Sequence, residues 1–319
     1  MKIGYFLSCE EFGPAELVRQ ARLAEEHGFQ GLWISDHYHP WNEAQGESPF
    51  VWSVIGAVAQ ATERLPVTTA VTCPTVRIHP AIIAQAAATS SLLLPGRFVL
   101  GVGTGEALNE HILGDDWPDA DTRLEMLEES IEIMRDLWQG GFVKHDGRHY
   151  VVENARVYSL PDEPPPVYVS GFGPKSITLA AEMADGYINT APDGDMIKQY
   201  REKGGKGPTQ AGTKVCWAED EQSAVKTAHR LWAHSGVPGE ASQELRVPKH
   251  YEQVAQLITE EMTAESVPCG PDPERHVAAI KEYIDAGYDE VYISQMGPEQ
   301  EGFFQFWEKE LQPRLAKLA

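Results

Sequence analysis

Cysteine is scarce in this chain, and long apolar runs are missing. The sequence contains only 4 cysteines, without CxxC spacing: Cys9, Cys73, Cys216 and Cys269. This excludes a disulfide-stapled fold, and we expect reduced thiols. No apolar stretch approaches the roughly 20 residues that a membrane-spanning helix needs. The first residues run into a strand-like segment rather than a secretory signal, so we expect a cytoplasmic protein.

Positive charge is also in short supply. Lys and Arg number 26 against 48 Asp and Glu, and the formal net charge is −22. The electrostatic field of such a negative chain repels phosphate backbones and anionic membrane surfaces, which argues against nucleic acid and membranes as partners. A small anionic ligand is still allowed, because backbone amides at a helix start can hold a phosphate. We expect a small-molecule substrate and a homodimer.

What the chain does contain is a series of short apolar runs that alternate with helix-like segments. Most runs are rich in β-branched or aromatic residues, as are strands buried on both faces of a parallel sheet. Eight such units predict a closed (β/α)8 TIM barrel of the α/β class, formed by residues 1–319 as a single domain. The predicted strands are residues 3–8, 31–35, 67–71, 98–102, 167–170, 186–189, 214–217 and 290–294.

The segments between the strands predict helices and one large insertion. A β-prone stretch at 142–152, centred on Gly147, predicts a hairpin outside the barrel. Residues 233–273 form an insertion between strands 7 and 8, and we expect it to be a lid or substrate wall. Amphipathic patterns predict helices over 14–27, 50–63, 81–93, 120–138 and 219–232.

The carboxyl ends of the strands carry the active site in such barrels. Strand one leads to Glu10, and strand two leads to Asp36, His37 and Trp41. These supply carboxylates, a proton carrier that titrates near neutrality and a flat wall. His37 and His39 would also suit zinc, but the ends of strands five and six offer no further histidine. We therefore expect no metal, and we expect His39 to be a solvent-facing turn residue.

Two glycine-rich turns follow strands four and five. Residues 101–110, GVGTGEALNE, lack the last glycine of a dinucleotide fingerprint, but they let a flat ligand approach the backbone beside Glu106 and Asn109. Residues 170–176, SGFGPKS, place Pro174 at a helix start, where free amides and Lys175 suit a phosphate. Together the turns indicate a flavin-like cofactor with a phosphorylated side chain.

The segments 35–41, 65–80 (LPVTTAVTCPTVRIHP) and 101–110 together resemble the luciferase-like flavin and deazaflavin oxidoreductases. Within them the chain is most similar to the glucose-6-phosphate dehydrogenases that use coenzyme F420, and the likeness covers nearly the whole chain. The resemblance implies a strand-three bulge with a non-proline cis peptide bond between Ala70 and Val71. It implies that His37, Trp41 and Glu106 face the substrate, supported by Glu10. The implied cofactor contacts are Asp36, Ala70, Val71, Cys73, Thr104, Gly105, Asn109, Phe172, Gly173, Lys175 and Ser176.

The chain departs from that pattern at the expected sugar-phosphate grip. Asp193 stands where such relatives carry lysine and Ser266 where they carry arginine, whereas Lys249 retains a lysine; Thr190 completes the expected substrate contacts. Cys73 likewise replaces a threonine of the cofactor site.

A deazaflavin accepts hydride and reacts poorly with oxygen, so the resemblance implies a dehydrogenase. The departures at the sugar-phosphate grip favour a non-phosphorylated alcohol or sugar as its substrate. Whether His37 or Glu106 is the base stays open. The alternatives are a sugar-phosphate dehydrogenase, an FMN-dependent monooxygenase, a non-catalytic flavin-binding relative and a metal-dependent hydrolase.

Overall fold

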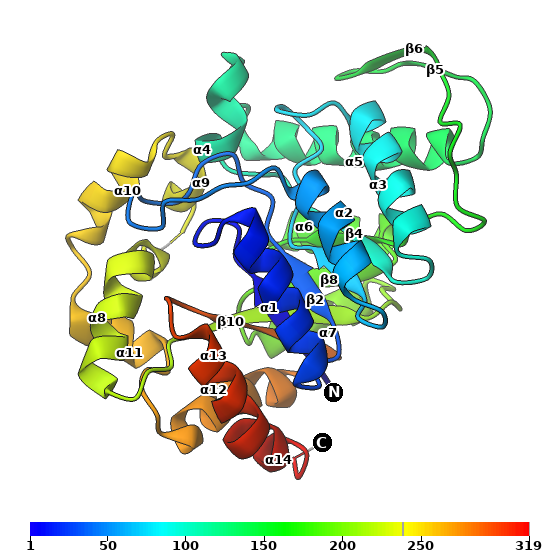
Figure 1. The fold of residues 1–319 in the computed structure, drawn as a ribbon. Helices are drawn as coiled ribbons and strands as arrows, with labels where there is room; N and C mark the ends of the chain where they lie inside the picture. The colour runs from blue at the N-terminus through cyan, green and yellow to red at the C-terminus, as the bar shows by residue number, and fades with distance from the viewer. Residues whose placement is uncertain (238, 319) are drawn as a thin grey trace.

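A closed barrel of parallel strands forms the centre of the computed structural model, which describes residues 1–237 and 239–318 (Figure 1). Going round the barrel, the strands follow their order in the chain, and β10 pairs with β1 to close it. The predicted (β/α)8 barrel is confirmed. Its strands are β1 (Lys2–Leu7), β2 (Leu32–Ile34), β3 (Val67–Thr69), β4 (Phe98–Val102), β7 (Val167–Ser170), β8 (Gly186–Asn189), β9 (Thr209–Val215) and β10 (Glu290–Gln295).

The barrel interior is a packed core rather than a pore. Trp33, Tyr168, Ile188 and Tyr292 form one buried cluster, in which the Trp33 and Tyr292 rings stack with centroids 4.8 Å apart. The Trp33 indole donates a hydrogen bond of 2.8 Å to Gln210 Oε1. Side chains that point inward from neighbouring strands therefore support the floor of the barrel mouth.

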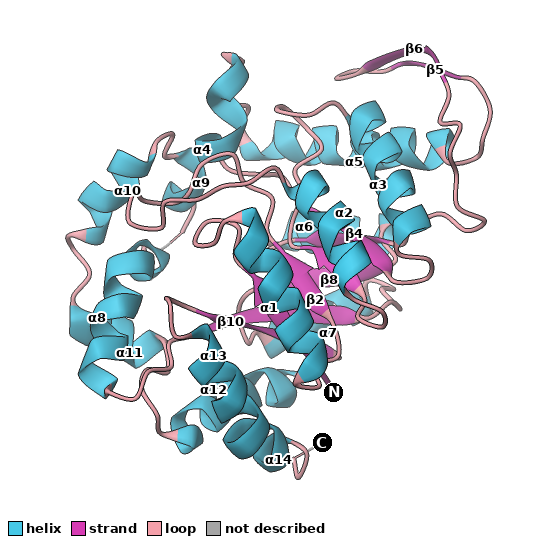
Figure 2. Cartoon of the chain, in the orientation of Figure 1, coloured by secondary structure: helices cyan, strands magenta, loops and turns pink. Residues whose placement is uncertain are grey.

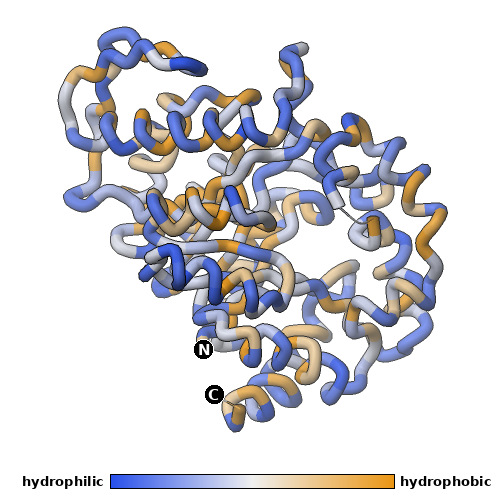
Figure 3. The backbone as a smooth tube through the Cα atoms, turned by 180° about the vertical axis from the view of Figure 1, so that it is seen from behind, coloured by the Kyte–Doolittle hydropathy of each residue, from blue (hydrophilic) through white to orange (hydrophobic). Residues whose placement is uncertain are grey.

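Helices enclose the strands on all sides in Figure 2. In Figure 3, α5 alternates between hydrophilic and hydrophobic residues, as expected of a helix with one face on the core. No described helix is long and apolar enough to cross a membrane. The helices around the barrel are α1 (Pro14–Glu26), α2 (Val51–Ala61), α3 (Pro80–Leu93), α4 (Ala107–Glu110), η1 (His111–Leu113), α5 (Ala120–Leu137), α6 (Pro174–Met183), α7 (Gly194–Glu202), α8 (Glu221–Trp232), α12 (Pro273–Ala286), α13 (Gln300–Phe306), η3 (Trp307–Leu311) and α14 (Gln312–Leu315).

The predicted hairpin is also present, as β5 (Val143–Asp146) and β6 (Val151–Ala155). It projects beside α5 at the upper right of Figure 1. The Glu129 carboxylate on α5 accepts hydrogen bonds from the backbone amides of His149 and Tyr150, each 3.0 Å long. One helix side chain thus holds the hairpin in place.

The insertion between β9 and β10 consists mainly of short helices, at the left of Figure 1. They are η2 (Ala233–Gly236), α9 (Ala241–Glu244), α10 (Pro248–Ala255) and α11 (Glu260–Ser266). Just before η2, the Leu231 carbonyl accepts hydrogen bonds from Asn42 and Gln45 of the loop after β2. From α5, the Arg123 guanidinium donates 2.9 Å to Gln243 of α9. Contacts to the loop after β2 and to helix α5 therefore hold the insertion beside the mouth.

The seventh strand begins earlier in the sequence than we predicted, because the predicted residues 214–217 cover only the end of β9. Its first half is polar, and Gln210 on it points into the barrel. Gln210 Nε2 donates to Glu290 at 2.8 Å and to the Tyr292 hydroxyl at 3.2 Å. A search for apolar runs misses a strand whose inward residues form a buried hydrogen-bond network.

Candidate active site

His37 and Glu10 lie together at the carboxyl ends of β2 and β1. His37 Nε2 is 3.5 Å from Glu10 Oε1, and His37 Nδ1 is 3.3 Å from the His39 carbonyl oxygen. Since a carbonyl can only accept, a proton on Nδ1 would donate to the His39 carbonyl, and Nε2 is the ring nitrogen that faces Glu10. The second oxygen of Glu10 accepts from the Ser8 and Ser35 hydroxyls, both at 2.8 Å. Glu10 is therefore fixed with one oxygen toward the imidazole.

His39 is not the solvent-facing residue that we expected. Its Nδ1 lies 2.9 Å from the Leu108 carbonyl oxygen, and its ring stacks on His111 with centroids 5.8 Å apart. These contacts tie the loop after β2 to α4. Among the described residues, no group of three or more His, Cys, Asp and Glu side chains is arranged to hold a metal ion.

A buried ionic cluster of Asp36, Arg77 and Glu110 was not anticipated from the sequence. Arg77 Nη2 is 2.9 Å from Asp36 Oδ1, and Arg77 Nε is 3.3 Å from Glu110 Oε1. Asp36 also accepts from the Thr72 hydroxyl at 2.9 Å. Burial opposes the charge on Arg77, but the two carboxylates outweigh it and raise the Arg77 pKa. The cluster joins the loops that follow β2, β3 and β4. In the sequence, Arg77 in the segment 65–80 was the one sign that a buried ionic cluster could form there.

Asn109 links the two predicted motifs to each other. Its side-chain oxygen accepts from the backbone amides of Tyr38 and His39, at 2.9 and 3.1 Å. Its amide nitrogen donates to Glu106 at 3.4 Å. Asn109 is only 2% exposed, so it positions the loop that carries His37 and orients the half-buried Glu106 carboxylate.

Thr104, Gly105 and Glu106 lie half-buried at the end of β4. Gly105 has φ +75° and would place a Cβ 2.5 Å from Cys73 Sγ, so this position requires glycine. Cys73 itself is buried, with Sγ 2.9 Å from the Thr75 hydroxyl. Burial raises the pKa of its thiol well above the usual value. The Cys73 side chain thus supports the turn from beneath.

Ala70 and Val71 form the bulge that the resemblance implies. The peptide bond between them is cis, and pairing resumes at Thr72, which bridges to Val102 of β4. Both residues are half-buried and pack on the aromatic cluster inside the barrel. They therefore present a small, partly exposed surface above the barrel core.

The turn between β7 and α6 has the predicted form, with Pro174 opening the helix. The Ser176 hydroxyl accepts from the Gly173 amide at 3.2 Å and donates to its carbonyl at 2.9 Å. A Cβ on Gly173 would meet no atom within 4 Å, so there is open space beside the turn. Phe172 is 49% exposed. Lys175 is also exposed and pairs with Asp121 at 2.6 Å.

Four rings form an aromatic wall of Trp41, Trp232, His234 and Tyr251. Trp41 packs on His37 with centroids 4.9 Å apart and on His234 at 5.1 Å. Tyr251 meets Trp41 edge-on at 5.1 Å. Three of the four rings come from the region from α8 to α10, and sequence reasoning assigned only Trp41 to the site.

Two further charged residues lie against this wall. Lys214 follows Gln210 and Gly212 on the inward face of β9, and its ammonium lies 4.3 Å from the centre of the Trp232 ring. Burial lowers the pKa of Lys214, although Glu10 and Glu11 counteract it. Burial likewise raises the pKa of Glu11 to about 7, even though it accepts hydrogen bonds from the Gly297 amide and the Trp232 indole. Because Lys214 lies at the end of a strand, the sequence could have identified it as a residue of the site.

The structure places the four expected substrate contacts farther out. Thr190 and Lys249 are exposed, and Ser266 is exposed at the end of α11. The Asp193 carboxylate caps α7 by accepting from the amides of Asp195 and Met196, at 3.0 and 3.1 Å. Helix capping therefore accounts for the acid at position 193.

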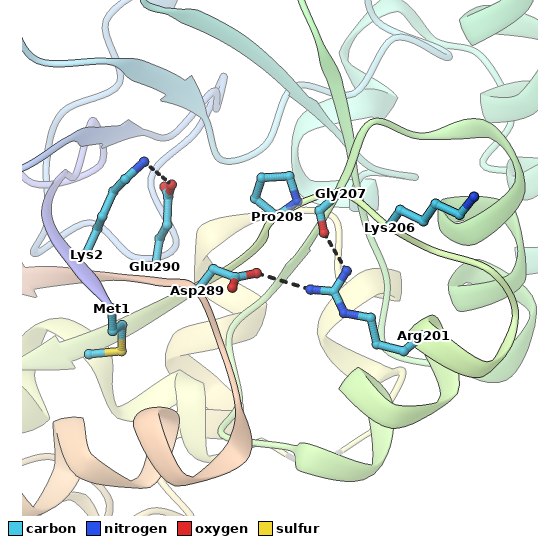
Figure 4. Close-up of a pocket in the computed structure, with 8 residues that line it drawn as sticks. All are labelled: Met1, Lys2, Arg201, Lys206, Gly207, Pro208, Asp289 and Glu290. Carbon is cyan, nitrogen blue, oxygen red and sulfur yellow. Dashed lines mark hydrogen bonds and ion pairs between the residues drawn. The ribbon is translucent and has the colours of Figure 1, made fainter. Parts of the chain in front are cut away.

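A separate depression of about 530 Å³ lies at the opposite, amino-terminal end of the strands (Figure 4). Its charged residues are largely paired with one another. Lys2 contacts Glu290 at 2.9 Å, and Arg201 contacts Asp289 at 3.2 Å. Since barrel enzymes place their chemistry at the carboxyl ends of the strands, this depression is not the candidate site.

The fold and the mouth together define a (β/α)8 barrel with acid–base groups at the carboxyl ends of its strands. Comparison with known proteins agrees with this class. The profile of the luciferase-like monooxygenase family matches residues 1–290. The chain belongs to this family.

Several of its relatives depend on coenzyme F420. The chain is 36% identical to an F420-dependent glucose-6-phosphate dehydrogenase of Microbacterium testaceum, across 99% of this chain and 98% of that protein. It is 37% identical to the one of Segniliparus rotundus, across 100% and 99%. A solved F420-dependent secondary alcohol dehydrogenase, in complex with an F420–acetone adduct, has a TM-score of 0.90 at 30% identity, covering 98% of both chains.

Proposed function

We propose that this protein is an F420-dependent dehydrogenase that oxidises a neutral, hydroxyl-bearing substrate. The observation that carries the proposal is the His37–Glu10 pair, with its Nε2–Oε1 distance of 3.5 Å and with His37 Nδ1 at 3.3 Å from the His39 carbonyl oxygen. The relatives support it, because those compared at 30% identity or more are dehydrogenases that depend on the same deazaflavin.

The mouth fits a flat, phosphorylated cofactor. Ala70 and Val71 would lie beneath the ring system, with Thr104 and Gly105 beside it. The open space at Gly173 and the start of α6 would accommodate a phosphate, since helix amides favour anions there. Lys175 would exchange its exposed partner Asp121 for that phosphate, because both side chains are solvent-accessible. Phe172, also exposed, could pack on the ligand.

His37 is proposed to take the proton of the substrate hydroxyl at Nε2. The resulting imidazolium would be stabilised by Glu10 Oε1, whose position is held by two serine hydroxyls. When bound, the deazaflavin supplies a ring carbon that accepts the hydride. Trp41 keeps the imidazole in place and provides a flat surface for the substrate.

Glu106 is proposed to hold a proton near the cofactor. Its carboxylate is half-buried and oriented by Asn109 Nδ2 at 3.4 Å. This position between the cofactor turn and the His37 loop makes Glu106 the second acid–base group of the site.

A neutral substrate is favoured by the charges at the aromatic wall. The cationic side chain of Lys214 points inward from β9, and the carboxylates of Glu10 and Glu11 compensate its charge. Arg77 is already paired with Asp36 and Glu110. A phosphate at this site would meet carboxylates rather than free cations.

The test begins with a titration of the protein with F420. A panel of alcohols, sugars and glucose 6-phosphate is then assayed, and the absorbance of the deazaflavin measures its reduction. We expect binding of F420 and oxidation of neutral alcohols or sugars. A kcat/KM for glucose 6-phosphate of ~10⁴ M⁻¹s⁻¹ or more, an ordinary enzyme value, would instead identify a sugar-phosphate dehydrogenase. Tight binding of FMN with oxygen consumption would identify a monooxygenase.

A further inference from the structure

Two buried amide side chains fasten the loop after β2 to the start of the insertion. Asn42 Nδ2 and Gln45 Nε2 donate hydrogen bonds of 2.7 and 3.0 Å to the same acceptor, the Leu231 carbonyl oxygen. Asn42 is 7% exposed and Gln45 5%. Leu231 lies in the last turn of α8, where carbonyl groups have no following helical amide to accept from. We call these two hydrogen bonds to the Leu231 carbonyl the clamp. The clamp fixes the point from which the insertion begins.

The two ends of the Gln45 amide contact different parts of the molecule. Its Nε2 belongs to the clamp, whereas its Oε1 accepts from the Trp41 backbone amide at 2.8 Å. The Asn42 side chain divides in the same way, because its Oδ1 accepts from the amides of Ala44 and Gln45 at 3.0 and 3.2 Å. One atom of each side chain therefore shapes the loop that carries Trp41, and the other atom holds α8. Trp41 in turn packs on His37, with ring centroids 4.9 Å apart.

The loop after β2 is anchored on two sides. Toward the insertion, the Glu43 backbone amide donates to the Glu252 carboxylate on α10 at 3.1 Å, which adds to the clamp (Figure 1). Toward the cofactor turn, the Asn109 side chain accepts from two backbone amides near the start of the loop, at 2.9 and 3.1 Å. Trp41 lies between these two anchors, and His37 directly precedes the first of them. The loop therefore connects the proposed cofactor side of the mouth to the aromatic wall.

We propose that Asn42 and Gln45 are positioning residues of the reaction, which act through Trp41 and hold the aromatic wall at a fixed distance from His37. This rests on the proposed function and refines it, because it assigns the insertion to substrate binding. Three of the four rings of the wall belong to the region from α8 to α10, whereas the proposed base belongs to a barrel loop. Without the clamp, the wall and the base can separate, and the carbon skeleton of a substrate loses apolar contact. Cofactor contacts depend on the other anchor of the loop.

The experiment breaks the clamp and keeps the contact to Trp41. Gln45→Glu removes the Nε2 donor and retains an oxygen that accepts from the Trp41 amide. Asn42→Asp makes the same change in the other half of the clamp, and it tests the proposal if Gln45→Glu does not fold. With the best neutral substrate of the panel, KM should rise at least ~10-fold, equivalent to about one hydrogen bond. Both kcat and the affinity for F420 should stay within ~3-fold, because the lost contact serves substrate binding.

The control is Gln139→Glu, which makes the same chemical change at an exposed helix end. Gln139 Nε2 donates to the Arg135 carbonyl of α5 at 3.4 Å, away from the aromatic wall. A surface substitution of this kind should leave KM within ~2-fold. A rise in KM confined to the clamp variants would therefore depend on the position of the lost donor and not on the added charge.

A second measurement does not depend on turnover. Amide hydrogen exchange of the protein without added cofactor should be faster in α9, α10 and α11 of both clamp variants, and unchanged in the β5–β6 hairpin. Unchanged exchange in the insertion, equal acceleration in the hairpin, or an unchanged KM would each overturn the proposal. So would loss of F420 affinity together with the rise in KM. If the unmodified protein binds F420 and oxidises alcohols, these results leave the proposed function intact. Absence of F420 binding or of any alcohol oxidation in the unmodified protein would overturn both.

Discussion

The ionic cluster and the aromatic wall at the mouth are built in different ways. Asp36, Arg77 and Glu110 follow three consecutive strands, and their charges pair at 2.9 and 3.3 Å. The aromatic wall combines Trp41 with rings from the region from α8 to α10, and its members meet through ring contacts rather than ion pairs.

The difference matches the tasks that we propose for the two sides. A buried ion pair has one good geometry and loses much when one partner is removed, which suits a cofactor site that must not vary. Ring contacts tolerate changes of shape, which suits a wall that receives a substrate. We therefore expect mutations in the ionic cluster to affect folding and cofactor binding together. Mutations in the aromatic wall should change substrate preference with smaller effects on stability.

The largest effect is expected for Arg77→Met. Removing the cation leaves two buried carboxylates without their partner, and such changes cost about 3–5 kcal/mol of unfolding free energy. Chemical denaturation and F420 titration on the same sample should show both a less stable protein and much weaker cofactor binding. The control is Arg135→Met, which removes a surface ion pair at 3.1 Å and should cost about 1 kcal/mol or less. Equal costs for the two variants would contradict the comparison.

Glu106→Gln is expected to lower turnover ~10²-fold or more. The substitution keeps the side-chain volume and removes the proton, and general acid–base groups contribute on this order. F420 affinity should change little, because Asn109 can still hydrogen-bond the amide oxygen. Steady-state kinetics together with a binding titration test this, and unchanged turnover would remove Glu106 from the mechanism.

Trp41→Ala should lower kcat/KM by about 10- to 100-fold while stability falls less than for a core tryptophan. Trp41 is half-buried and belongs to the aromatic wall, whereas Trp307 is 2% exposed and stacks on Phe29. Truncating a core tryptophan such as Trp307 costs about 3–5 kcal/mol. Melting temperatures and kinetics of the two alanine variants give the comparison. If Trp41→Ala is as destabilising as Trp307→Ala, Trp41 is a core residue rather than a wall.

Glu11 is expected to make stability depend on pH. Its pKa is raised from 4.5 to about 7 by burial, so the folded protein binds more protons than the unfolded chain between these values. Its contribution to stability is therefore lost as pH rises through that window. In Glu11→Gln, the fall in unfolding free energy between pH 5 and pH 8 should be smaller by about 2–3 kcal/mol. Urea denaturation at both pH values measures it, and an identical fall in both proteins would show that Glu11 does not titrate there.

The smallest effect is expected for Asp193→Ala. Loss of its cap on α7 should cost about 1 kcal/mol of unfolding free energy, with kinetics on neutral substrates unchanged. Urea denaturation and the alcohol panel measure the two effects. A large change in substrate preference with no loss of stability would assign Asp193 to the substrate site instead of the helix.

The amino-acid sequence alone was enough to predict the barrel, because a strand buried on both faces must be apolar and short, and it must recur with each helix. It was also enough to locate the motifs that contain Glu10, His37, Glu106 and Asn109, since each follows a strand end. In the seventh strand the same pattern failed, because Gln210 is buried through hydrogen bonds rather than through apolarity.

Only the tertiary structure decided which side chains meet across the mouth. Arg77 lies in a quoted motif, yet its pairing with Asp36 and Glu110 depends on three strands being neighbours. His234 lies far along the chain from Trp41, and no local pattern brings the two rings to 5.1 Å. Local periodicity reports what each segment buries, whereas contacts between distant segments depend on how the barrel closes and where the insertion packs.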